Sequence, residues 1–146
     1  PTSSFTLINR SLGVYVDYDS FSTPNSTVKE QIDHALDYYS TGEGSEYFEY
    51  NGFEYVRNQS EAEIRISAED LDDGVSIGQA WGPDLDEDGS LDYFDYTNII
   101  IDPEMDEDHI GWHVGYWIGI DATSINQKEN MPEPFDDSYE RRANWW

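Results

Sequence analysis

The segment from Trp112 to Ile120 constrains the fold most strongly, because it is the one extended apolar stretch in a chain dominated by acidic residues. Asp102 and Pro103 precede it, and Asp at the N-cap followed by Pro at the first helical position is a typical helix start. We therefore predict a helix from about residue 104 to residue 118. After His109 this helix is apolar nearly all round, so we expect it to be buried.

Three glycines recur every four residues in this helix, at Gly111, Gly115 and Gly119. Each glycine costs about 1 kcal/mol of helix propensity relative to alanine. A glycine stripe allows close packing, and we expect this stripe to lie against a β-sheet.

The other elements follow from hydrophobic periodicity. A capping-box spacing from Thr27 to Glu30, followed by an apolar stripe at helical period, predicts a long helix that ends at the glycines at 42 and 44. Strands are predicted at residues 12–18, 53–57, 62–67, 76–81 and 97–101, the fourth as a short edge strand. The pattern indicates an α+β fold, a twisted mixed sheet of four to five strands with a long helix and a buried second helix.

The charge of the chain excludes several partners. The 32 Asp and Glu residues against 7 Lys and Arg give a net charge of −25 at pH 7. Such a field repels nucleic acid and anionic membranes, so we expect no nucleic-acid binding and no membrane insertion. At molar salt the Debye length is about 3 Å, and dense carboxylates then hold water and cations rather than repel one another. We therefore expect a halophilic protein.

A length of 146 residues fits one domain, here with an N-terminal arm over about 1–11 and a C-terminal tail over about 126–146. The start at Pro1 suggests a processed mature chain. Three Asn-x-Ser/Thr sequons fit an exported glycoprotein, and their asparagines are Asn9, Asn25 and Asn58. We expect an extracellular or cell-surface protein.

The acidic loop from Asp84 to Asp95 has the spacing of a calcium loop. Its oxygen donors are Asp84, Asp86, Asp88, Ser90, Asp92 and Asp95. Gly89 at the sixth position allows the sharp turn around a cation, and Leu91 at the eighth anchors the loop to the core. Asp95 replaces the usual bidentate Glu, and the alternative is a bare acidic loop of a halophile. We predict a bound calcium that stabilises the fold.

The order of elements, the motif Gly115-x-x-x-Gly119 and a downstream Met131-Pro132 resemble the matrixin-like metallopeptidases of the metzincin group, including the small exported ones of haloarchaea. The resemblance spans residues 12 to 135 and implies an archaeal protein with a zincin-like fold. The family motif is H-E-x-G-H-x-x-G-x-x-H followed by a Met-turn, in which three histidines bind zinc and the glutamate deprotonates the zinc-bound water.

Aligned on its two glycines, this chain departs from the motif at the chemistry. The zinc-ligand positions hold Trp112, Tyr116 and Ala122, and the glutamate position holds His113. Indole and a methyl group do not coordinate zinc, and a phenol is a poor substitute for imidazole. Without zinc, water keeps its bulk pKa, so no hydroxide forms at neutral pH. The alignment implies a degenerate site with no catalytic residue.

A competing alignment uses His109 and His113, which are four residues apart on one helix face, as zinc ligands do. It places Ile110 at the glutamate position. Asp106, Asp108 or Asp121 would then have to complete the site. This alternative keeps open a zinc-dependent metallopeptidase.

These observations favour a non-enzymatic pseudopeptidase that acts as a structural, self-assembling surface protein, either as a homo-oligomer or with another surface protein. The chain has 22 aromatic residues, more than one small core needs, and it ends in Trp145-Trp146. Exposed aromatic side chains are natural interface anchors. A peptide-binding pseudoenzyme, which captures extended chains beside the edge strand, is a further alternative.

Overall fold

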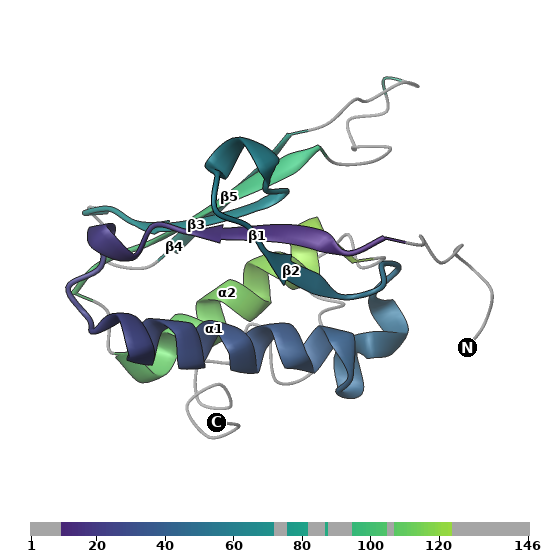
Figure 1. The fold of residues 1–146 in the computed structure, drawn as a ribbon, viewed down its shortest axis with the longest axis horizontal. Helices are drawn as coiled ribbons and strands as arrows, with labels where there is room; N and C mark the ends of the chain where they lie inside the picture. Colours follow the sequence, from purple (N-terminus) through teal and green to yellow (C-terminus); the bar gives the residue numbers. More distant parts are fainter. Residues whose placement is uncertain (1–9, 72–75, 82–86, 88–94, 105–106, 124–146) are drawn as a thin grey trace.

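The computed structural model describes residues 10–71, 76–81, 87, 95–104 and 107–123. These residues form a mixed α/β unit in which a five-stranded sheet carries two long helices on the same face (Figure 1). The coarse α+β prediction is therefore confirmed.

The sheet has the strand order β2-β1-β3-β5-β4. Its strands are β1 (Leu12–Val16), β2 (Phe53–Tyr55), β3 (Ile64–Ala68), β4 (Ser76–Trp81) and β5 (Tyr96–Ile101). The first three and β5 are mutually parallel, whereas β4 pairs antiparallel with β5 and forms an edge. All five strands lie within about two residues of their predicted positions, and β4 is the edge strand that the sequence predicts.

Alternation of side chains along the strands separates the two faces of the sheet. The face toward the helices is apolar and buried, and its strand residues include Val14, Val16, Ile64, Ile66, Ile99 and Ile101. β5 is fully buried on one face only, because Asn98 and Ile100 on its other face are half-buried. The other face carries polar and aromatic side chains and is crossed by the short helix η3 (Gln59–Glu61) (Figure 1).

The two long helices begin at other residues than predicted. α1 (Asn25–Ser40) starts before Thr27, with Pro24 as its N-cap residue and without a side-chain cap. α2 (Glu107–Asp121) starts three residues late and ends three residues late. Asp102 does not cap it, because its carboxylate accepts hydrogen bonds from the Glu104 N–H (2.9 Å) and the Leu71 N–H (3.0 Å).

Within the described residues, no helix is long and apolar enough to cross a membrane. The apolar stripe of α1 packs on α2 and on the sheet, and this three-part contact forms the core.

Candidate functional site

α2 carries the histidines and aromatic residues of the two candidate zinc alignments, and one of its sides faces α1. The Gln31 side chain accepts a hydrogen bond from the Gly111 N–H (3.0 Å), and the Tyr39 hydroxyl donates to the Gly115 carbonyl (2.9 Å). Both polar side chains of α1 are buried. This part of the glycine stripe therefore lies against α1, and the expectation that the stripe packs on the sheet is wrong there.

The side of α2 that faces the sheet contacts β4 through a buried polar cluster. The Ser76 hydroxyl lies 2.7 Å from His113 Nδ1 and accepts a hydrogen bond from Trp117 Nε1 at 2.9 Å. The indole N–H can only donate, so Ser76 has its own proton to give to Nδ1. Gly78 leaves room for the Trp117 ring, because a Cβ there would lie 2.5 Å from Trp117 Cε3. His113 is 4% exposed, so it packs as a core residue.

One helical turn after Trp117, Asp121 lies on the same side of α2. Thr97 on β5 donates a hydrogen bond from Oγ1 to Asp121 Oδ2 at 2.7 Å. Burial raises the pKa of Asp121 from 3.8 to about 6, and the bond from Thr97 lowers it in part. The last turn of a helix also disfavours a negative charge. Asp121 is therefore a partly buried acid with a pKa of about 6. Its carboxylate accepts a hydrogen bond from Thr97, and it lies two helical turns from His113.

The residues at the family's zinc-ligand positions form packed core. Trp112 and Tyr116 are buried and stacked, with ring centroids 4.9 Å apart and an interplanar angle of 18°. Ala122 is buried as well, and its N–H continues the helical hydrogen bonding to the Ile118 carbonyl. An indole, a phenol and a methyl group in van der Waals packing do not fit a zinc ion, which requires nitrogen, sulfur or carboxylate ligands.

The competing pair of histidines, His109 and His113, lies on α2. His109 is half-buried, and His113 turns its Nδ1 toward Ser76. Among the residues that the structure describes, no three His, Asp or Glu side chains gather into a metal-binding group. Asp106 lies outside the described residues, and for Asp108 only the backbone is described.

Most of the predicted calcium loop lies outside the described residues, namely Asp84, Asp86, Asp88, Ser90 and Asp92. Asp95 is described, and its N–H donates to the Trp81 carbonyl, which joins the end of the loop to β4. Glu87 has a φ of 58°, a left-handed conformation that is uncommon outside turns. The calcium site stays a prediction.

Two of the three sequons are described. Asn25 is the first residue of α1 and is exposed, and Asn58 is exposed just before η3. The Asn58 side chain contacts Glu61 at 3.3 Å. Asn9 lies outside the described residues.

No protein-family model and no curated protein matches the chain. The resemblance to matrixin-like peptidases therefore rests on the motif positions and the order of elements alone.

Two groupings of polar side chains had no signal in the sequence. Ser76 is one serine of an expected edge strand, and its contact with α2 depends on how the helix crosses the sheet. Arg65 lies on the outward face of β3. It lines a small cavity that forms only when β1, β3 and β5 are aligned side by side.

Proposed function

We propose that the chain is an exported, haloarchaeal-type, matrixin-like domain that has lost its zinc chemistry and acts as a structural surface protein. One observation carries the proposal: the positions at which the family binds zinc hold the buried Trp112, Tyr116 and Ala122. Aromatic side chains bury about 150–250 Å² each, so packing here supplies stability that an ion supplies in the enzymes.

The arrangement of elements supports a zincin-like fold. α1 is long, β4 is an antiparallel edge strand of a mixed sheet, and α2 is buried against both α1 and β4. These features agree with what the resemblance leads us to expect.

Self-association is the function that we favour within this class. Trp81 is 52% exposed on β4, and Tyr55 is 38% exposed on β2. At molar salt the Debye length of about 3 Å screens the charge of −25, so that acidic subunits can approach one another. Sedimentation velocity in molar KCl should show oligomers that dissociate at low salt. Trp81→Ser should weaken them, and Gln79→Ser, at an exposed β4 position, should not. A monomer under all conditions would refute the assembly proposal.

A zinc peptidase that uses His109 and His113 is the rival function. Metal analysis of protein purified without chelator, combined with a casein assay, separates the two. We expect less than stoichiometric zinc and no cleavage. Stoichiometric zinc together with cleavage that His113→Ala abolishes, while His34→Ala leaves it intact, would overturn the proposal. His34 is the matched control because it is an exposed histidine on α1.

Peptide capture at the outer edge of β4 is the second candidate, and the edge position of this antiparallel strand favours it. An extended peptide would add as a further strand through main-chain hydrogen bonds. Oligomers that persist unchanged at saturating peptide would argue that assembly does not use this edge.

A further inference from the structure

A small polar cavity lies on the face of the sheet that the helices leave uncovered. Its volume is about 210 Å³, and its polar lining residues are Tyr15, Asp17, Gln59, Arg65, Ser67 and Asn98. The strand residues among them alternate with the buried residues that face α1 and α2. Sites for drug-sized ligands usually measure about 300–1,000 Å³. The cavity therefore suits a smaller molecule, about the size of an amino acid or one sugar ring.

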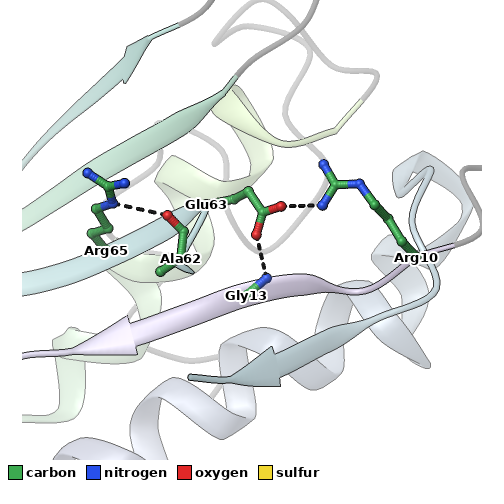
Figure 2. Close-up of polar contacts among 5 residues, drawn as sticks. All are labelled: Arg10, Gly13, Ala62, Glu63 and Arg65. Carbon is green, nitrogen blue, oxygen red and sulfur yellow. Dashed lines mark hydrogen bonds and ion pairs between the residues drawn. The ribbon is translucent and has the colours of Figure 1, made fainter. Parts of the chain in front are cut away.

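Arg65 stands at the centre of this cavity, between Tyr15 on β1 and Asn98 on β5. Its Nε donates to the Ala62 carbonyl at 3.0 Å, and its guanidinium lies 4.0 Å from the centroid of the Tyr96 ring. Figure 2 shows that the two terminal nitrogens point away from Ala62. Two contacts thus fix the plane of the guanidinium while its terminal N–H groups extend beyond them, which is a preorganised arrangement for a carboxylate.

Within the described residues, no acid forms an ion pair with Arg65. Glu63, two residues earlier, binds the Arg10 side chain and accepts the Gly13 N–H at 2.8 Å (Figure 2). Lys29 pairs with Asp33 on α1. These are the two ion pairs within the described part of the chain, so Arg65 has no carboxylate within 4 Å there. This is unexpected in a chain with 32 acids and 7 basic residues.

Asp17 supplies the opposite charge in the lining of the same cavity. Its N–H bonds to the Ile66 carbonyl, so it continues the line of β1 two residues beyond Tyr15. Two residues of an extended chain span about 6.6 Å. Arg65 and Asp17 thus line one cavity without forming an ion pair, so a ligand that bears both charges finds a partner for each.

We propose that this cavity binds a small zwitterion of the α-amino-acid class. The ligand's carboxylate binds the terminal nitrogens of Arg65, and its ammonium group binds the Asp17 carboxylate. Ser67 and Asn98 hydrogen-bond the remaining polar atoms. A simple carboxylate leaves Asp17 without a counter-charge, and an uncharged polyol uses neither charge. This site is independent of the assembly proposed above.

Isothermal titration calorimetry of the full chain with L-alanine, acetate, methylamine and glucose tests the proposal. L-alanine should bind saturably and at least about tenfold more tightly than the other three, because only it satisfies both charges. Arg65→Gln and Asp17→Asn should each weaken L-alanine binding by about tenfold or more. Arg57→Gln should leave it unchanged, because Arg57 is exposed and does not line the cavity.

Arg65→Gln also removes the contact with Tyr96, so the variant protein could lose binding because it misfolds. A second variant distinguishes that outcome from the loss of a ligand contact. Ser67→Leu fills the cavity and keeps both charges, so it should abolish binding while circular dichroism shows a folded protein. The proposal is overturned if L-alanine gives no saturable heat, if acetate or glucose binds as tightly, or if folded Ser67→Leu protein binds normally.

Discussion

Replacing Asp121 by Asn should stabilise the protein near neutral pH while retaining the partly buried hydrogen bond from Thr97. Thr97 donates to Asp121 Oδ2, and the amide oxygen of Asn accepts the same bond. What changes is the charge. Burial raises the pKa of Asp121 from 3.8 to about 6, so the folded protein disfavours the carboxylate form.

The size of the effect follows from that pKa. One pKa unit corresponds to about 1.4 kcal/mol, so the rise to about 6 amounts to roughly 3 kcal/mol. Between pH 3.8 and about 6 the folded state binds more protons than the unfolded state, so the contribution of Asp121 to stability falls as the pH rises. Below pH 3.8 the acid is protonated in both states and the variant gains nothing. Above pH 6 the full gain of about 3 kcal/mol is present.

Urea unfolding and thermal unfolding of the two proteins at pH 3.5, 5 and 8, at fixed ionic strength, measure this difference. At pH 8 the variant should melt about 6–12 °C higher, since 1 kcal/mol shifts the melting temperature of a domain of this size by about 2–4 °C. Glu54→Gln, at an exposed position on β2, is the control for a lost surface charge. A difference between the Asp121 proteins that is the same at pH 3.5 and pH 8 would refute the reasoning.

Three further changes test the contacts of α2 and the acidic loop. Gly78→Ala should destabilise the protein by about 1–3 kcal/mol in urea unfolding, because the added Cβ would meet the Trp117 ring at 2.5 Å; an unchanged midpoint would contradict this packing. Ser76→Ala should cost about 1–3 kcal/mol, since His113 and Trp117 both lose their bond to its hydroxyl, whereas Ser76→Thr should retain part of it. Chelation of calcium at fixed ionic strength should lower the melting temperature, because a ligand at 100 times its Kd stabilises the folded state by about 2.7 kcal/mol. A melting temperature that does not change with chelator would argue against a calcium site at residues 84–95.

The helices and strands whose apolar residues recur at a regular spacing were predictable from the sequence. The stripe of α1 and the alternation in β1 and β3 place the correct side chains in the core, as Val28, Ile32 and Val14 illustrate. The start of α2 was not predictable, because Asp102 has two competing uses. Its carboxylate binds nearby N–H groups in a turn and ties residue 71 to it, so a helix-start signal was satisfied without a helix.

The environment of the candidate site was predictable only in part. Burial of Trp112 and Tyr116 follows from an apolar helix. The partner of His113 is not predictable, because Ser76 lies 37 positions away and meets it only through the antiparallel pairing of β4 with β5. The cavity at Arg65 likewise depends on long-range register, which no local pattern encodes.

The contact between α1 and α2 has a consequence for synthesis of the chain. Tyr39 and Gln31 bind backbone groups that lie 76 and 80 positions later in the sequence. The apolar face of α1 therefore leaves the ribosome well before its partner helix, and the parallel pairing of β3 with β5 must also wait. Such late, non-local contacts slow folding, and apolar surface stays exposed until they form. We expect the nascent chain to depend on chaperone protection until α2 has been translated.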